Sequence, residues 1–262
     1  MPMVTGKRGA EGVQAVVLAL DMLEFIAGSQ RAVGVTELAR AFATTKSRIH
    51  RHLRTLVSAG YLTQESETER YRASARLMAL GQAVSEGHEL TATARPTMRA
   101  LRDQLGHSVA ISVPEGTAMR IIGTMPGTSN VEMGVKPGSL LTLHGSAQGK
   151  VALAFGDESL MRRLMQAPLE QLTQNTLVDP LDLAADVRDV RSRGWATAYN
   201  QALLGLNALA APIFDALGRF AGAIGLVDSI QFIPESPGQD QIDAIVAAGL
   251  RISRDLGNRD AL

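Results

Sequence analysis

Residues 46–60, KSRIHRHLRTLVSAG, are the feature that most constrains the fold, because their pattern defines one helix with two different faces. Ile49, Leu53, Leu56 and Val57 follow helical spacing and form one apolar stripe. Gly60 is expected to end the helix. At about 100° per residue, the opposite side carries only hydroxyl-bearing and basic side chains: Ser47, Arg48, Arg51, Arg54 and Ser58. Such a helix packs on a small core and presents a basic surface.

The segments around this helix predict a winged helix-turn-helix. Residues 13–27 repeat Val, Leu and Ile at helical spacing. Residues 35–42 read as a second helix, with Thr36 as its expected cap and Glu37 in its first turn. A tight turn at 43–45 leads into the third helix. Two short strands, 61–64 and 70–73, are expected around a polar hairpin, which would form the wing.

Charge predicts what this unit binds. The 26 basic and 26 acidic residues of the chain cancel, but no acid lies between Glu37 and Glu65, where five basic residues occur: Arg40, Lys46, Arg48, Arg51 and Arg54. A local basic stripe on a neutral protein indicates a nucleic acid partner.

Arginine can bind guanine with two hydrogen bonds, hydroxyl groups can bind bases or phosphate, and a recognition helix enters the major groove by its N-terminal residues. We therefore predict contacts to double-stranded promoter DNA from Thr45, Lys46, Ser47, Arg48, His50, Arg51 and Arg54 on the helix and from Arg70 and Arg72 on the wing. For His50 and His52, packing or phosphate contact is favoured over base reading. The alternative is a three-helix module that binds protein.

The rest of the chain predicts an α+β domain with a largely antiparallel sheet. A linker helix is expected at 75–90, and a second helix at 94–106 that begins near Pro96. Further helices are expected at 146–156, 158–166, 180–194 and 237–257. Strands are expected at 107–113, at 118–124, before the Pro-Gly turn at 137–138, at 195–201 and on both sides of a turn near 216–218.

Other motifs exclude several classes of protein. The chain has no cysteine, which removes disulfides, thiolate metal sites and cysteine nucleophiles and agrees with a reducing cytoplasm. The first twelve residues lack the apolar run of a signal peptide, and no run of 18 apolar residues occurs. Neither HExxH nor GxSxG is present. We therefore predict a cytoplasmic, non-membrane protein with no catalytic or metal site and no cofactor.

The stretch HGSAQGK, residues 144–150, resembles a phosphate-binding loop but does not match one. Its two glycines are separated by three residues instead of four, and Val151 follows Lys150 where a hydroxyl would hold Mg²⁺. His144 and Ser146 could suggest a base and a nucleophile, but residues this close on one loop seldom face each other, and no third member is evident. An enzyme is the weakest of the alternatives.

The order and spacing of several segments resemble the IclR family of transcriptional regulators: VQAVVLALDMLEFIA, VTELARAF, KSRIHRHLRTLVSAGYL, YRASARLMALG, LHGSAQGKVALAF and ALAAPIFDALGRFAGAIGL. The resemblance implies a winged helix-turn-helix DNA-binding domain at 1–73, a linker helix at 74–92 and a GAF-like effector-binding domain at 93–262. It also implies a homodimer or tetramer. One departure is Val17-Leu18, where the family often has Asp-Arg, which predicts a more apolar surface for a dimer or linker contact.

The same resemblance implies where an effector binds. Members that bind small polar acids such as glyoxylate use an acid, a cysteine and two serines, and register places these at Ala198, Ala208, Gly225 and Val227. A polar ligand would therefore lose its buried partners, which is costly.

We expect a larger and more apolar effector, an aromatic carboxylate or phenol, that controls a catabolic or uptake operon. Its carboxylate would meet the helix start at Gly145 and Ser146. The expected walls are Met125, Met133, Val135, Leu143 and Tyr199. The alternatives are a small aliphatic acid as effector, a pocket filled by ordinary core residues, and an architectural DNA-binding protein without a ligand.

Overall fold

The computed structural model describes residues 13–29, 31–86, 89–129 and 134–258. The chain divides into two compact units, Met1–Val84 and Ser85–Leu262. Each unit has its own core and is described by itself. In the described part of the chain, no helix combines the length and the apolar character needed to cross a membrane.

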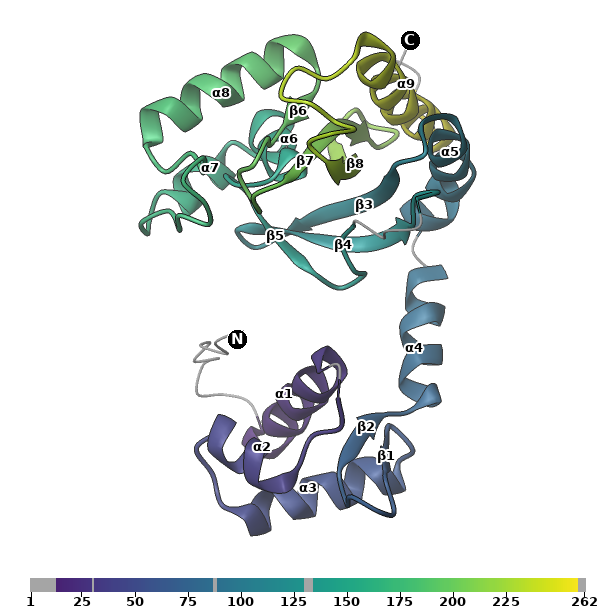
Figure 1. Ribbon diagram of the computed structural model, residues 1–262, viewed down its shortest axis with the longest axis vertical. Helices are drawn as coiled ribbons and strands as arrows, with labels where there is room; N and C mark the ends of the chain where they lie inside the picture. The colour runs from purple at the N-terminus through teal and green to yellow at the C-terminus, as the bar shows by residue number, and fades with distance from the viewer. Residues whose placement is uncertain (1–12, 30, 87–88, 130–133, 259–262) are drawn as a thin grey trace. The chain divides into compact units, whose positions relative to one another are not determined.

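The N-terminal unit is a winged helix-turn-helix (Figure 1). Its helices are α1 (Gln14–Gly28), α2 (Val35–Ala41) and α3 (Lys46–Ser58), and its antiparallel hairpin joins β1 (Leu62–Gln64) to β2 (Tyr71–Ala73). All five elements contribute to one core, formed by Met22, Ile26, Val33, Leu38, Ile49, Leu53, Leu56, Leu62 and Tyr71.

The pattern of α3 determines how it packs. Ile49 and Leu53 are fully buried, and Val57, at the edge of the stripe, is half-buried. Thr45 caps the helix, since its Oγ1 accepts a hydrogen bond from the Arg48 amide at 3.4 Å. The chain leaves the helix through Gly60 at a positive φ of 79°, as expected for a glycine at this position.

The predicted cap of α2 at Thr36 is wrong. The helix begins one residue earlier, at Val35, and Gly34 occupies the N-cap position without a side-chain hydrogen bond. Glu37 does lie in the first turn, where its two carboxylate oxygens accept hydrogen bonds from Arg31 at 2.7 and 3.0 Å.

The helix predicted to begin near Pro96 begins earlier. Helix α4 covers Ala75–Glu86, and α5 covers Glu89–Leu105 with Pro96 inside it. Proline removes one backbone hydrogen bond from a helix, but the buried stripe of α5 continues across it through Leu90, Ala94, Met98 and Leu101. Burial of that stripe outweighs the lost bond, and α5 ends at Gly106, whose φ is 78°.

The C-terminal unit is built on a six-stranded antiparallel sheet in the order β5-β4-β3-β8-β7-β6. Its strands are β3 (Ser108–Glu115), β4 (Ala118–Met125), β5 (Leu140–Thr142), β6 (Ala196–Thr197), β7 (Leu206–Phe214) and β8 (Phe220–Ser229). Four helices besides α5 complete the unit: α6 (Ala147–Phe155), α7 (Ser159–Leu164), α8 (Pro180–Arg193) and α9 (Gln239–Asp255).

The two faces of the sheet are covered by different helices (Figure 1). Leu209, Ala211 and Ile213 of β7 share one core with α5 and α9. The alternating residues Ala208 and Ala210 face a second core formed with α6, α7 and α8. The small side chains on this second face allow a helix to approach the sheet closely.

Three predicted strand positions need correction. The strand expected to end at residue 113 is longer, because β3 continues through Glu115. The strand expected at 195–201 contains only Ala196 and Thr197. Residues 130–133 lie outside the described chain, residues 134–139 form no strand, and β5 follows the Pro-Gly turn instead of preceding it.

Candidate functional site

Helix α3 presents an unpaired basic surface. Lys46, Ser47, His50, Arg51 and Arg54 are exposed. No hydrogen bond or ion pair joins the Arg51 or Arg54 guanidinium to another residue in the part of the chain described here.

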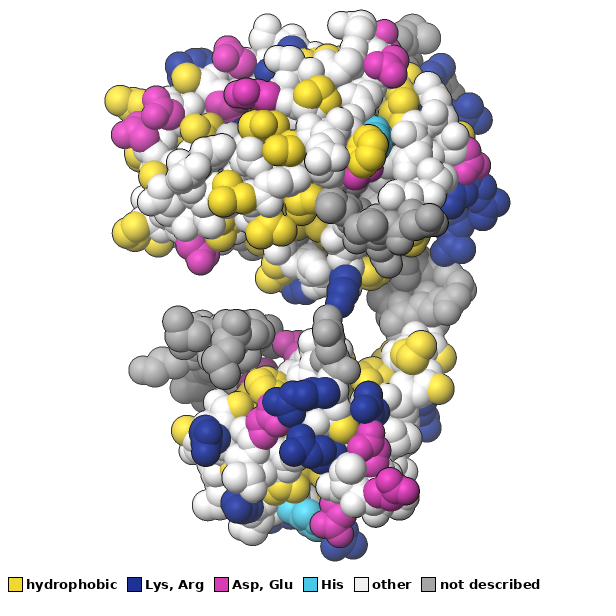
Figure 2. Space-filling view, viewed as in Figure 1, with side chains coloured by type: hydrophobic (Ala, Val, Ile, Leu, Met, Phe, Trp, Pro, Cys, Tyr) yellow, Lys and Arg dark blue, Asp and Glu magenta, His cyan; other side chains and the backbone are white. Residues whose placement is uncertain are grey.

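Arg48 is half-buried, and Thr45 Oγ1 lies 3.2 Å from Ser47 Oγ at the start of α3. On the face of this unit that Figure 2 displays, Lys and Arg side chains lie among Asp and Glu side chains.

The two wing arginines are already engaged. Arg72 forms an ion pair with Glu65, and the Thr68 hydroxyl donates to the other Glu65 oxygen at 2.6 Å. The hydrogen bond from Thr68, followed by that from Arg72, lowers the pKa of Glu65. Arg70 donates to the Ala32 carbonyl at 3.2 Å. The wing therefore offers less free positive charge than α3.

His52 contributes no positive charge to this surface at neutral pH. Burial lowers its pKa, and the neighbouring Arg51 and Arg48 guanidinium groups lower it further. The imidazole therefore stays neutral beside two permanent cations.

The C-terminal unit contains a cavity of about 90 Å³ between the sheet and the start of α6. Its lining is mostly apolar and, among the residues that the structure describes, includes no charged side chain and no histidine. It is lined by Ala110, Val135, Leu141, Ser146, Ala147, Gln148, Ala198, Ala202, Leu206, Asn207, Ala208, Gly225, Leu226 and Val227.

Part of the predicted effector site lies at this cavity. The four positions where the family register implied polar ligand contacts, Ala198, Ala208, Gly225 and Val227, all line it, as do Val135 and Ser146. Positions distant in the sequence therefore meet around one space.

Other predicted effector residues lie elsewhere. Met125 lines an adjoining hollow that shares Ala110, Val135 and Val227 with the cavity. Leu143 packs in the core beneath α6, and the half-buried Tyr199 is absent from the cavity lining. Met133 lies outside the described residues.

The HGSAQGK stretch forms the first turn of α6. Ser146 caps the helix: its Oγ accepts from the Gly149 amide at 3.0 Å and donates to the Thr142 carbonyl at 2.6 Å. Gly145 fits against Thr142 and Leu172 and does not line the cavity. Ala147 and Gln148 do line it, and they occupy the first two positions of the helix.

Gln148 and Asn207 are the polar lining residues that the sequence did not place in the site, and Gln148 reaches furthest across the fold. Its side chain is buried and donates from Nε2 to the Ala110 carbonyl at 3.1 Å and the Ala223 carbonyl at 3.4 Å. The sequence shows a glutamine inside the HGSAQGK stretch, at a position now seen to be buried. Only the fold shows that it reaches across two strands.

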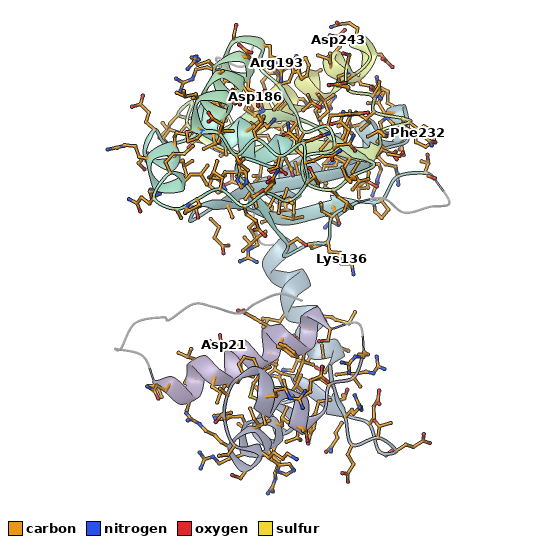
Figure 3. All side chains as sticks on the ribbon, turned by 60° about the vertical axis from the view of Figure 1, so that its left-hand side comes forward. Asp21, Lys136, Asp186, Arg193, Phe232 and Asp243 are labelled. Atoms are coloured by element: carbon orange, nitrogen blue, oxygen red, sulfur yellow. The ribbon has the colours of Figure 1, made fainter. Side chains whose placement is uncertain are left out.

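Lys150 is buried, with 1% of its side chain exposed. Its Nζ lies 2.8 Å from Asp186 Oδ2 of α8 and donates to the Thr197 carbonyl of β6 at 3.1 Å. Burial lowers the pKa of Lys150, the Asp186 carboxylate opposes that effect, and Arg193 adds to the lowering. Figure 3 shows Asp186 and Arg193 on α8. The lysine therefore joins α6, α8 and β6 and takes no part in an anion-binding loop.

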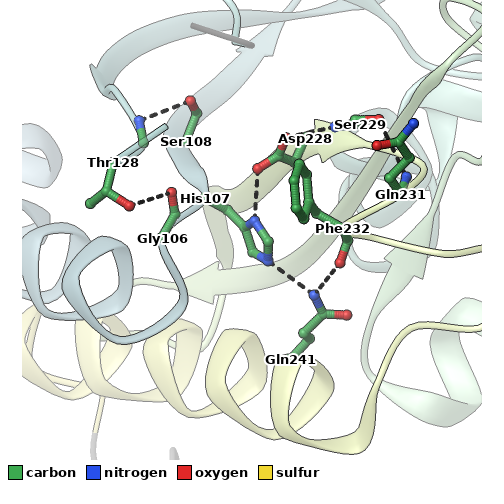
Figure 4. A network of polar contacts seen from close by, with 10 residues as sticks. Gly106, His107, Ser108, Thr128, Asp228, Ser229, Gln231, Phe232 and Gln241 are labelled. Carbon is green, nitrogen blue, oxygen red and sulfur yellow. Dashed lines mark hydrogen bonds and ion pairs between the residues drawn. The ribbon is translucent and has the colours of Figure 1, made fainter. Parts of the chain in front are cut away.

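A second set of buried polar side chains forms a hydrogen-bond network that connects the start of β3 and the end of β8 to α9 (Figure 4). Gln241 Oε1 accepts from the Gly238 amide, and its Nε2 donates to the Phe232 carbonyl at 2.9 Å and to His107 Nε2 at 3.0 Å. His107 must then donate from Nδ1 to Asp228 Oδ2, 2.8 Å away. Each described member has a partner, which is the pattern of a structural network.

The geometry gives no support to a serine nucleophile. The Ser146 hydroxyl is used by the α6 cap, and His144 Nε2 donates to the Glu170 carbonyl at 2.8 Å. Within the described residues, no group of three or more His, Asp or Glu side chains could hold a metal ion.

Two family models match this chain. Residues 15–66 match the IclR helix-turn-helix domain, and residues 82–254 match the bacterial transcriptional regulator IclR C-terminal domain. The matched regions contain α3 and the cavity.

Characterised relatives extend the similarity over most of the chain. The HTH-type transcriptional regulator BhcR of Paracoccus denitrificans is 30% identical over 252 residues, covering 95% of this chain and 90% of the relative. The transcriptional repressor IclR of Escherichia coli is 32% identical over 206 residues, or 78% and 75% of the two chains.

Solved structures share the fold. The Thermotoga maritima IclR structure aligns with a TM-score of 0.77 at 23% identity over 94% of this chain and all of its own. An IclR homologue from Microbacterium hydrocarbonoxydans, solved with 4-hydroxybenzoate, aligns with a TM-score of 0.81 at 20% identity over 92% and 98% of the two chains.

Proposed function

Because this chain belongs to the IclR family of transcriptional regulators, we propose that an apolar organic acid, of the aromatic class, binds its cavity and controls a catabolic or uptake operon. The chain is a DNA-binding regulator and not an enzyme. The observation that carries the proposal is the cavity lining, in which the family's polar ligand positions are alanine, glycine and valine.

The chemistry of the lining favours an aromatic or otherwise apolar ligand body. Leu141, Leu206, Leu226 and Val227 supply apolar surface, and a two- or three-carbon acid would leave most of it uncovered. A carboxylate would meet the amides that begin α6. The IclR homologue bound to 4-hydroxybenzoate supports this ligand class by analogy of fold.

A ligand screen separates this proposal from the alternative of a small aliphatic acid. We expect benzoate-type acids to raise the Tm of the protein by several degrees at millimolar concentration, because only the folded state binds them. Glyoxylate and pyruvate should have no comparable effect. Stabilisation by those two acids alone would contradict the aromatic assignment.

We propose that the protein responds as a dimer on promoter DNA. Recognition helices of a dimer must match half-sites separated by a helical turn or its multiples. An effector that binds one of two arrangements of the dimer more tightly would shift that spacing and therefore operator affinity. The linker helix α4 is the segment proposed to transmit the change.

The dimer contact is proposed on the exposed apolar surface of α1 and α4. Val16, Leu20 and Met78 are 55%, 49% and 72% exposed, which is unusual for side chains of this size on a small unit. Val17 and Leu18 are both half-buried, and Leu18 packs against the core of the unit, so this pair adds less apolar surface than Val16 and Leu20 do.

Leu20→Glu is expected to weaken dimerisation about tenfold or more, because a carboxylate would be desolvated in an apolar contact. Analytical ultracentrifugation over a concentration series measures the effect. Leu181→Glu, which changes a more exposed leucine of α8, is the control and should leave association unchanged. If Leu20→Glu dimerises as tightly as the parent protein and the control do, α1 is not part of the interface.

Arg51→Ala is expected to weaken operator binding by about tenfold to hundredfold, because an unpaired guanidinium at the centre of α3 is lost. Fluorescence anisotropy with a DNA fragment carrying the protein's own promoter region measures it. Arg72→Ala should reduce operator affinity less than Arg51→Ala does, since Arg72 is already paired with Glu65. Arg188→Ala, at an exposed site on α8, is the control. Unchanged affinity and specificity in Arg51→Ala would show that α3 is not the recognition helix.

A further inference from the structure

We infer that Gln148 selects effectors that carry a hydrogen-bond donor, a hydroxyl or N–H group, and that Gly225 gives it the space to do so. This inference rests on the proposed effector function of the same cavity and narrows the chemistry of the ligand.

The orientation of the Gln148 amide follows from its partners. Both partners of Nε2 are backbone carbonyl oxygens, Ala110 O at 3.1 Å and Ala223 O at 3.4 Å, and only a nitrogen can donate to them. The two N–H groups of the amide are therefore used. The remaining polar atom of the side chain is Oε1, which can only accept a hydrogen bond. It has no partner among the described residues.

In the other polar side chains of the lining, each oxygen and nitrogen atom already has a hydrogen-bond partner. Asn207 Oδ1 accepts from Thr197 Oγ1 at 2.7 Å and from the Ala208 amide at 2.8 Å, while its Nδ2 donates to the Pro234 carbonyl at 2.8 Å. The Ser146 hydroxyl both donates and accepts within the α6 cap. Among the side-chain oxygen and nitrogen atoms that the structure shows around the cavity, Gln148 Oε1 is the one without a hydrogen-bond partner.

Gly225 and Gln148 depend on each other. A Cβ at position 225 would lie 3.0–3.1 Å from Cγ, Cδ and Nε2 of Gln148. Gln148 cannot retreat as a whole, because Gly149, the next residue of α6, is packed against the backbone of Leu143. A side chain at position 225 and a glutamine at position 148 therefore compete for one volume.

An unpaired acceptor atom on a residue that is only 5% exposed determines which ligand group can face it. A hydroxyl or N–H group would satisfy Oε1, whereas a carboxylate there would set two acceptors against each other. The preferred ligand therefore has an apolar body and a donor directed at Gln148. A site built around a buried hydrogen bond discriminates against analogues that lack the donor.

Two pairs of acids of matched size test this inference: 4-hydroxybenzoate with 4-methylbenzoate, and 6-hydroxyhexanoate with heptanoate. Isothermal titration calorimetry on the full chain should show that, in at least one pair, the hydroxylated acid binds about tenfold more tightly than its methyl counterpart. In Gln148→Met, a substitution that keeps the length and removes the acceptor, that preference should disappear. Gln231→Met, at an exposed glutamine of the same unit, is the control and should retain it.

Gly225→Ala supplies a second measurement that does not remove the amide. Its Cβ displaces Gln148, so the hydroxylated acid should lose about as much affinity as in Gln148→Met. A parent protein that binds neither hydroxylated acid more tightly than its counterpart, or a Gln148→Met variant that keeps the preference, would overturn the inference. The regulatory proposal is tested separately, by promoter binding of the same preparations, and can hold when the donor inference fails.

Discussion

Asp186→Ala should lower the free energy of unfolding by about 3 kcal/mol, because it leaves the Lys150 ammonium buried without its counter-ion. Lys150 is almost completely enclosed, and within the described chain the Thr197 carbonyl would be its remaining hydrogen-bond partner. Asp186 itself is 25% exposed, so the loss should fall at the lower end of the range for fully buried pairs. Chemical denaturation followed by circular dichroism measures it.

The control for this variant is Asp189→Ala, at an exposed carboxylate on the same helix. This substitution should change the free energy of unfolding by about a few tenths of a kcal/mol at most. Lys150→Met/Asp186→Ala should recover much of the loss, since no buried charge remains. If Asp186→Ala unfolds at the same denaturant concentration as Asp189→Ala, the ion pair contributes little to the stability of the unit.

The pH dependence of Asp186→Ala has a definite sign. Burial already lowers the pKa of Lys150 in the parent, and loss of the carboxylate that favours the ammonium should lower it further. Between the folded pKa and the ordinary lysine pKa of 10.5, the unfolded chain then binds more protons than the folded one. Stability of the variant should therefore rise with pH across that window, and the full penalty should be present below it.

Gly149→Ala should destabilise the C-terminal unit by about 3 kcal/mol or more, although alanine is the better helix former. The new Cβ would lie 2.5 Å from both Cα and O of Leu143 and closer still to the Thr142 carbonyl. These are backbone atoms and cannot rotate away, so α6 would have to move from the sheet. The same denaturation assay measures the loss, and calorimetry with 4-hydroxybenzoate should show that binding is lost with it.

Gly28→Ala is the matched control, because it changes another helical glycine whose added Cβ would meet nothing within 4 Å. It should be neutral or slightly stabilising. A Gly149→Ala variant as stable as Gly28→Ala would mean that α6 tolerates displacement from the 142–143 backbone, and would weaken the case that Gln148 is held in place.

The N-terminal unit was predictable because its signals are local. The stripe of α3, the Thr45 cap position and the glycine stop lie within a few residues of each other, and the burial of Ile49 and Leu53 follows from their spacing. Two of the wrong predictions concern where a helix begins. Helix α2 begins one residue before the predicted cap at Thr36. Helix α5 begins well before Pro96, because its buried apolar stripe continues through the proline.

For the effector site, the sequence indicated which polar ligand-binding side chains are replaced by apolar residues. The fold decided which residues lie together around the cavity. The family register placed Ala198, Ala208, Gly225 and Val227 in one site, and the structure brings them around one cavity. Nothing local could show that Tyr199 and Leu143 lie outside the lining. In a sheet and its covering helix, neighbours in space are strands apart in the chain.

Sequence by itself therefore determined a neutral, cysteine-free chain with a basic recognition helix and a separate α+β domain, because periodicity and composition act over short segments. The tertiary structure alone decided the roles of Gln148 and Lys150. Gln148 bonds to backbone groups 38 and 75 residues away, and Lys150 bonds to a carbonyl 47 residues away. A buried polar side chain takes its role from the partners that the fold brings to it, because leaving it unpaired costs more than any local preference can offset.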